Sequence, residues 1–172
     1  MADPFAVLEV EPTFALDLVA LEKRHRDLSR ALHPDRFTGR SAGERRQAIG
    51  RAIEVNEAYR VLKDPVKRAR ALLHRRGHEQ DEEASGTVEP ALLMQVMERR
   101  EALSEARRAG DLGAVRRLAA EVAERERRLE SELGATFAAE PLDVAAVEKA
   151  LAELRYHRRF SEEAGTALDE LE

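Results

Sequence analysis

The 172-residue chain contains no cysteine, and this absence removes several kinds of chemistry at once. Without a thiol, the chain cannot form a disulfide, use a cysteine nucleophile or bind a metal or cluster through thiolates. The lack of cysteine also fits a reducing compartment. Tryptophan is absent too, and the chain has only five Phe and two Tyr. A large pocket lined by a sheet is therefore not expected.

Long apolar runs are missing as well. No stretch approaches the roughly 20 apolar residues that a membrane-spanning helix requires. The first residues, Met1-Ala2-Asp3-Pro4, lack the basic region and the apolar stretch of a secretory signal. We therefore expect a cytoplasmic protein that does not bind membranes.

Charged and helix-forming residues are plentiful. Charged residues make up 37% of the chain, and Ala, Leu, Glu and Arg are abundant, which is typical of an all-α protein with a thin core. The net charge of −5 is unevenly distributed. Residues 1–76 contain 16 Lys and Arg against 11 Asp and Glu, whereas residues 77–172 contain 13 against 23. This asymmetry indicates two modules with different partners.

The first module, residues 1–76, has the periodicity of four helices. Asp3 and Asp17 are the expected N-caps of the first two, and Pro34 ends the second because proline lacks an N–H group. We predict helices at 4–10, 18–32, 44–62 and 65–75, with a polar loop at 33–43. The expected buried side of the third helix is formed by Ala48, Ile49, Ala52, Ile53, Asn56, Tyr59 and Leu62.

The second module begins after residues 77–89, which are rich in Gly, Glu and Ser, lack an apolar period and are predicted to be a linker. Gly110 and Gly134 are expected to end the first two helices that follow. Short connections between helices favour an antiparallel three-helix bundle, which we place at residues 90–172. Its helices are predicted at 90–108, 112–133 and 142–168.

A short motif, His33-Pro34-Asp35, follows the second helix directly. Three residues are a weak signal by themselves, but the surroundings strengthen it. The preceding helix has a basic face, formed by Lys23, Arg24, Arg26 and Arg30, and the next long helix ends in Asn56-Glu57-Ala58-Tyr59. Over residues 1–75 this arrangement resembles the J domain: a helical hairpin with two short flanking helices.

The resemblance implies contact with an ATPase chaperone of the DnaK/HscA class. It assigns the contact to His33, Pro34 and Asp35, with support from Arg24, Arg26 and Arg30. Pro34 fixes the backbone, Asp35 can pair with an arginine of a partner, and the basic residues can steer the chain onto an acidic surface. For the basic residues individually, a solvated charged face is an equally good interpretation.

The whole chain is similar to the HscB family of co-chaperones. The local features are Asp3-Pro4-Phe5, the segment 64–73 and the segment 92–103. The resemblance implies that the chain activates a DnaK/HscA-type ATPase and delivers an IscU-type scaffold to it during iron–sulfur cluster assembly. It implies no cofactor, because the scaffold would ligate any cluster. The alternative is a J-domain co-chaperone for another protein client.

The helix predicted at 90–108 is apolar over much of its circumference. Leu92, Val96 and Leu103 can form one core stripe, which leaves other apolar residues partly off it. Either a partner or another part of the chain covers them, and methionine is common at recognition surfaces. Tyr156 is either a further contact or a core residue with its hydroxyl at the surface. The resemblance implies a scaffold-binding face formed by Leu93, Met94, Met97, Glu98, Arg100, Glu101 and Tyr156.

Two other kinds of function are disfavoured. A pair such as His33 and Asp35 can act as a base, but catalysis needs a nucleophile or a metal beside it, and neither is evident. We therefore expect no enzyme and no metal site. Nucleic-acid binding is disfavoured by the acidic second module and by the lack of aromatics among the basic residues.

Overall fold

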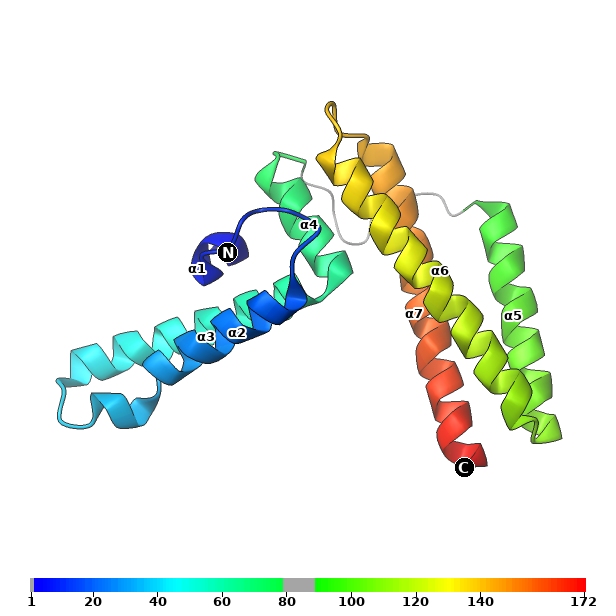
Figure 1. The fold of residues 1–172 in the computed structure, drawn as a ribbon, viewed down its shortest axis with the longest axis horizontal. Coiled ribbons are helices and arrows are strands. Elements are labelled where there is room, and N and C mark those ends of the chain that lie inside the picture. Colours follow the sequence, from blue (N-terminus) through cyan, green and yellow to red (C-terminus); the bar gives the residue numbers. More distant parts are fainter. Residues whose placement is uncertain (1, 79–88) are drawn as a thin grey trace. The chain divides into compact units, whose positions relative to one another are not determined.

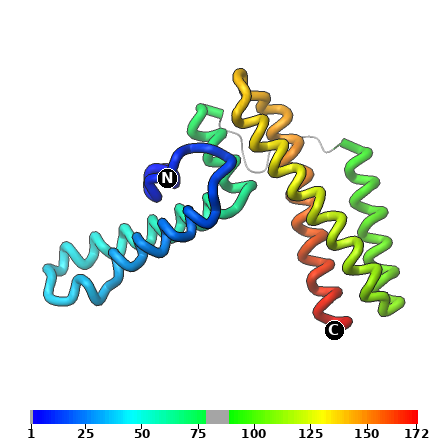
Figure 2. The backbone as a smooth tube through the Cα atoms, viewed as in Figure 1, coloured from blue at the N-terminus to red at the C-terminus, as the bar shows by residue number. Residues whose placement is uncertain are grey.

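The computed structural model describes residues 2–78 and 89–172. This part of the chain consists of helices and loops without a strand, as the all-α prediction requires. The chain divides into two compact units, Met1–Glu79 and Gln80–Glu172 (Figures 1 and 2). Most of the linker predicted at residues 77–89 lies outside the described residues. None of the described helices has the length and apolarity needed to span a membrane.

The first unit is built on an antiparallel hairpin of two long helices (Figure 1). The predicted caps are confirmed: Asp3 Oδ1 accepts a hydrogen bond from the Phe5 amide at 3.1 Å, and Asp17 Oδ1 accepts one from the Val19 amide at 2.9 Å. The elements of the unit are α1 (Pro4–Leu8), α2 (Leu18–Ala31), the 3-10 helix η1 (Pro34–Phe37), α3 (Ala42–Lys63) and α4 (Pro65–Arg75).

Helix α3 begins two residues earlier than predicted, and part of the predicted loop 33–43 is the 3-10 helix η1. The early start has a local cause. Ser41 Oγ accepts from the Glu44 amide at 3.2 Å, and Glu44 Oε2 accepts from the Ser41 amide at 2.9 Å. Such a reciprocal capping box satisfies two amides that would otherwise lack partners at the helix start.

The predicted buried side of α3 is partly wrong. Ile49 and Ile53 are 52% and 64% exposed, and Asn56 is exposed as well, whereas Val55 and Ala58 are buried. Helix α1 packs against α3 and α2 packs against its other flank, so the buried face is centred near Val55. Since successive helical residues rotate by about 100°, Ile53 points almost away from it. The core of the unit also includes Phe5, Leu8, Phe14, Leu21, Leu62, Ala69, Leu72 and Leu73.

The second unit is a three-helix bundle of α5 (Pro90–Ala109), α6 (Leu112–Ala138) and α7 (Val144–Leu171). Ion pairs join Arg100 to Glu163 and Arg107 to Glu170, so α5 and α7 run parallel. Arg116 pairs with Glu172 and Arg125 with Glu153, so α6 runs antiparallel to α7. This confirms the predicted bundle. One cluster of its core is formed by Leu103, Ala106, Val115, Val122, Phe160, Ala164 and Ala167.

Gly134 does not end the sixth helix as predicted, because α6 continues to Ala138. Leu133 is fully buried and Phe137 is 4% exposed, so the turns around the glycine pack into the core. A glycine inside a helix costs about 1 kcal/mol. Burial of a Leu or Phe side chain contributes about 1.5–3 kcal/mol, which outweighs that cost.

Candidate functional site

The His33-Pro34-Asp35 motif forms the turn that follows α2. His33 is the N-cap of η1, and its Nδ1 accepts a hydrogen bond from the Asp35 amide at 3.3 Å. The His33 carbonyl oxygen also accepts from the Arg36 amide at 3.0 Å. An Nδ1 that accepts carries no proton, so the neutral ring holds its proton on Nε2. The turn is therefore closed from both sides, and the ring has a defined orientation.

The two functional groups of this turn are open to solvent. The His33 and Asp35 side chains are 59% and 88% exposed. The Asp35 carboxylate lies 3.4 Å from His33 Nδ1, a contact that becomes an ion pair only when the ring is protonated. One imidazole and one carboxylate thus stand beside each other on a rigid corner, where a partner can reach both.

The hairpin behind this corner is fastened by His25. Its ring stacks on Tyr59 with 4.2 Å between the ring centroids and 13° between the planes. His25 Nε2 lies 2.9 Å from Asn56 Oδ1, so a protonated Nε2 donates to the amide oxygen. His25 is therefore a packed, hydrogen-bonded residue between the two helices. Because His25 precedes His33 by about two helical turns, this contact fixes α2 against α3 close to the corner.

The basic residues of α2 differ in their availability. Arg26 and Arg30 are exposed, and Arg26 is 3.2 Å from Glu22 in a surface pair one turn away. Arg24 is only partly exposed, because its Nε donates to the Leu8 carbonyl at 3.2 Å and its guanidinium pairs with Glu9. Arg24 therefore holds α1 to α2, while Arg26 and Arg30 are better placed to meet a partner.

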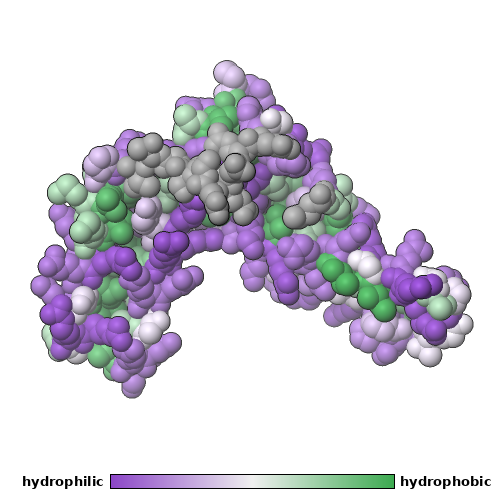
Figure 3. Space-filling view, turned by 180° about the vertical axis from the view of Figure 1, so that it is seen from behind, coloured by the Kyte–Doolittle hydropathy of each residue, from purple (hydrophilic) through white to green (hydrophobic). Residues whose placement is uncertain are grey.

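The apolar residues of helix α5 fall into a buried group and an exposed group, as the sequence indicated. Val96 and Leu103 are buried, at 8% and 5% exposure. Leu93, Met94 and Met97 remain 46%, 62% and 63% exposed. Apolar surface is visible near the beginning of α5 in Figure 3. Such a contiguous apolar patch on a helix is typical of a surface that binds another protein.

The polar residues predicted for this face play different roles. Glu98 and Glu101 are exposed beside the apolar residues. Arg100 instead contacts Glu163 of α7, with 2.9 Å between Nε and Oε2, and this hydrogen bond raises the pKa of Arg100. Arg100 therefore fastens α5 to α7. Tyr156 is half-buried on α7, which is compatible with either role predicted for it.

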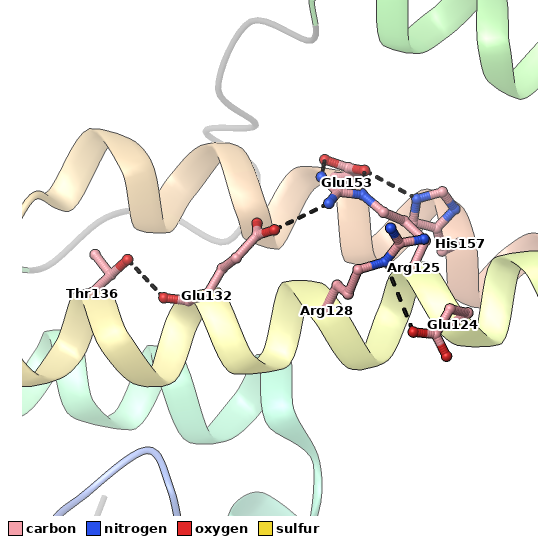
Figure 4. A network of polar contacts seen from close by, with 7 residues as sticks. All are labelled: Glu124, Arg125, Arg128, Glu132, Thr136, Glu153 and His157. Carbon is pink, nitrogen blue, oxygen red and sulfur yellow. Dashed lines mark hydrogen bonds and ion pairs between the residues drawn. The ribbon is translucent and has the colours of Figure 1, made fainter.

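A polar network between α6 and α7 was not predicted from the sequence (Figure 4). His157, 1% exposed, lies 3.2 Å from Glu153 Oε1. Arg125 of α6 approaches both oxygens of that carboxylate, at 2.7 and 3.0 Å. The His157 hydrogen bond, together with Arg125, lowers the pKa of Glu153 to about 2. The spacing of Glu153 and His157 was visible in the sequence, but Arg125 is 28 residues away.

This network predicts a specific acid sensitivity of the second unit. Because the pKa of Glu153 is lower in the folded protein than the ordinary 4.5, its stabilising effect is complete above about pH 4.5 and is lost as the pH falls toward 2. We expect Glu153→Gln to lower the free energy of unfolding at pH 7 by about 2 kcal/mol and to flatten the loss of stability between pH 4.5 and 2.

The measurement is urea unfolding of the full chain at several pH values, with hydrogen exchange of α6 and α7 amides reporting on the bundle. Glu162→Gln, at an exposed position of the same helix, is the matched control and should change the stability by less than about 0.5 kcal/mol. Parallel pH profiles for the Glu153→Gln variant and the unchanged chain would contradict the assignment.

The described residues contain no group of three His, Asp or Glu side chains that could hold a metal ion. A helical hairpin that ends in an exposed His-Pro-Asp corner, followed by a helical bundle, defines a J-domain co-chaperone. Residues 3–71 match the model of the DnaJ domain, and residues 88–165 match the HSCB C-terminal oligomerisation domain. The chain belongs to the HscB family.

Similar proteins span almost the whole chain. It is 36% identical over 168 residues to the co-chaperone protein HscB homolog of Paraburkholderia xenovorans, covering 98% of this chain and 95% of that relative. The homolog of Burkholderia multivorans is 38% identical with the same coverage. The chaperone HscB from Vibrio cholerae has a similar structure, with a TM-score of 0.86, 28% identity and 99% of both chains covered. The crystal structure of human co-chaperone protein HscB gives 0.84 at 26% identity, covering 96% of this chain and 82% of that one.

Proposed function

We propose that this chain stimulates ATP hydrolysis by a chaperone of the DnaK/HscA type and delivers an IscU-type scaffold protein to it during iron–sulfur cluster assembly. The observation that carries the proposal is the exposed, rigid His33-Pro34-Asp35 corner beside the basic face of α2. The exposed apolar face on α5 supplies a second contact surface on the same chain.

At the ATPase end, the chain acts by binding and leaves the chemistry to its partner. Asp35 offers an exposed carboxylate that can pair with an arginine, and Arg26 and Arg30 attract an acidic surface. A bound protein accelerates hydrolysis only if it binds the hydrolysing conformation of the ATPase more tightly than the resting one. The rigid corner favours such discrimination because little ordering is needed when it docks.

At the cargo end, apolar contact is the main source of affinity. Met94 and Met97 are exposed, flexible and polarisable, so they can adapt to the surface of a scaffold. Glu98 and Glu101 add negative charge beside them and favour a scaffold surface with basic residues around an apolar centre. The cluster would remain on the scaffold, because this chain has no cysteine to ligate it.

Both ends on one chain give the cargo a high effective concentration near the ATPase. The test is the steady-state ATPase rate of an HscA-type chaperone with the chain, with an IscU-type scaffold, and with both. We expect the chain to stimulate the rate and the scaffold to increase that stimulation further. A chain without any effect would contradict the proposal. If the chain stimulates the ATPase but the scaffold neither increases this stimulation nor binds the chain in a pull-down, the alternative is favoured: a J-domain co-chaperone for another client.

A further inference from the structure

Two isoleucines on α3 are exposed without a role in the fold or in the surfaces described so far. Ile49 and Ile53 are 52% and 64% exposed and lie one turn apart on the same side of the helix. By contrast, Val55, Ala58 and Leu62, which follow them on α3, are buried. The pair therefore forms a separate apolar patch, which we call the isoleucine patch.

The position of the isoleucine patch follows from the contact between His25 and Asn56. These residues are 2.9 Å apart and fix the register of the antiparallel helices α2 and α3. Ile53 and Ile49 precede Asn56 by three and seven residues, so all three lie on the same side of α3, with the two isoleucines turned further toward solvent than Asn56. At 1.5 Å per residue, Ile49 lies roughly 10 Å beyond Asn56, in the direction in which His33 lies roughly 12 Å beyond His25.

The isoleucine patch thus runs alongside the hairpin toward the His-Pro-Asp corner. The end of the patch nearer the corner is basic, because Arg45 and Arg46 are exposed on α3 one turn before Ile49. At the other end, Glu57 lies one turn after Ile53 and pairs with Arg60. Figure 3 shows apolar surface on the hairpin with hydrophilic surface on both sides. A partner that covers the patch must therefore present an apolar surface next to negative charge.

We propose that the isoleucine patch, formed by Ile49 and Ile53, binds the same ATPase chaperone as the corner, against an apolar area beside its acidic docking surface. The inference rests on the proposed function, since it extends that contact onto α3. The corner and the basic residues supply orientation and steering, while the isoleucines supply a contact that does not depend on charge.

The size of the patch favours this occupant over a second copy of the chain. Two isoleucines offer roughly 200 Å² of apolar surface, whereas a stable complex buries roughly 800 Å² on each partner. The patch is therefore too small to bind alone and must extend a larger interface. The adjoining surface is the corner with the basic face of α2, and its arginines would repel the same surface of a second copy.

The test uses the full chain and an HscA-type chaperone. The variant carries Ile49→Gln and Ile53→Gln, which removes the apolar groups while retaining good helix propensity. The matched control is Val19→Gln, because Val19 is 76% exposed on α2 but lies roughly 20 Å along the helix from His33. A second variant, Ile49→Leu with Ile53→Leu, keeps the apolar character.

The readout is the concentration of the chain that gives half-maximal ATPase stimulation, at 50 and 200 mM salt. We expect the double Gln variant to need about tenfold more protein at both salt concentrations, because salt screens charges but not apolar contact. The Val19→Gln and double Leu variants should remain within about twofold of the unchanged chain. Scaffold affinity, measured in the same preparations, should not change.

Two outcomes separate this inference from the proposed function. If the unchanged chain stimulates the ATPase and the double Gln variant does so at the same concentration, the isoleucine patch is not part of the contact. An effect that disappears at 200 mM salt would equally overturn the apolar role. If the unchanged chain does not stimulate the ATPase at all, the proposed function fails and this inference fails with it.

Discussion

Replacement of His33 by Gln is expected to abolish stimulation of the partner ATPase and to leave the chain folded. The His33 side chain is 59% exposed, so its loss leaves no cavity in the core. Its Nδ1 closes the corner by accepting from the Asp35 amide, and its ring is offered to solvent. Glutamine provides neither the flat ring nor an acceptor in the same place. The ATPase rate with a saturating amount of the variant should equal the unstimulated rate.

A matched control exists at the end of the same unit. His78 is exposed and lies outside the corner, so His78→Gln should stimulate the ATPase like the unchanged chain. Helix content, measured by circular dichroism, should be the same in both variants. Full stimulation by His33→Gln would remove the corner from the proposed mechanism, while loss of stimulation in both variants would indicate a general defect.

Replacement of Met94 and Met97 by Ala is the second large effect, and it concerns the other end of the chain. We expect weaker scaffold binding by about 1–3 kcal/mol, the range of interface anchors, which corresponds to a roughly 5- to 150-fold increase in Kd. The two side chains are more than 60% exposed, so their truncation removes little packing within the bundle. Titration calorimetry of the full chain with an IscU-type scaffold measures the change.

Leu18→Ala is the control for this experiment, because Leu18 is an exposed apolar residue of the first unit. It should leave the Kd for the scaffold within a factor of two. An undiminished affinity of the double methionine variant would show that the scaffold binds elsewhere. A large drop in melting temperature would instead mean that the methionines support the bundle.

The two experiments together test whether the ends of the chain work independently. His33→Gln should still bind the scaffold with normal affinity, and the methionine variant should still stimulate the ATPase when no scaffold is present. The two sets of changes lie in different units of the chain and are expected to affect different partners. A chain with both sets of changes should therefore lose both activities and remain folded.

Some features of this protein have local causes in the sequence, and others depend on contacts between distant segments. The ends of most helices were predictable, because Asp3, Asp17, Pro34 and Gly110 act on their own or immediately neighbouring backbone groups. The His33-Pro34-Asp35 corner was identified for the same reason. Its residues are contiguous, and their hydrogen bonds stay within a few positions of the chain.

Other features depended on neighbours that the sequence does not identify. Gly134 stays helical because Leu133 and Phe137 pack into the bundle. Arg24 and Arg100 carry the charge expected of surface contacts, yet each is paired with another part of its unit, through Glu9 and Glu163. The helical state of Gly134 and the two arginine ion pairs therefore depend on which side chains the fold places next to these residues.

The sequence by itself therefore determined the all-α class, the two modules, the exposed corner and the helix α5 that is apolar over much of its circumference. Caps, prolines and apolar periods are local signals. Only the tertiary structure decided that Ile49 and Ile53 are exposed and that Arg125 meets Glu153. Which face of a helix is buried depends on the position of its neighbours, and for α3 these are chiefly α1 and α2. Contacts between distant segments form only when packing brings them together.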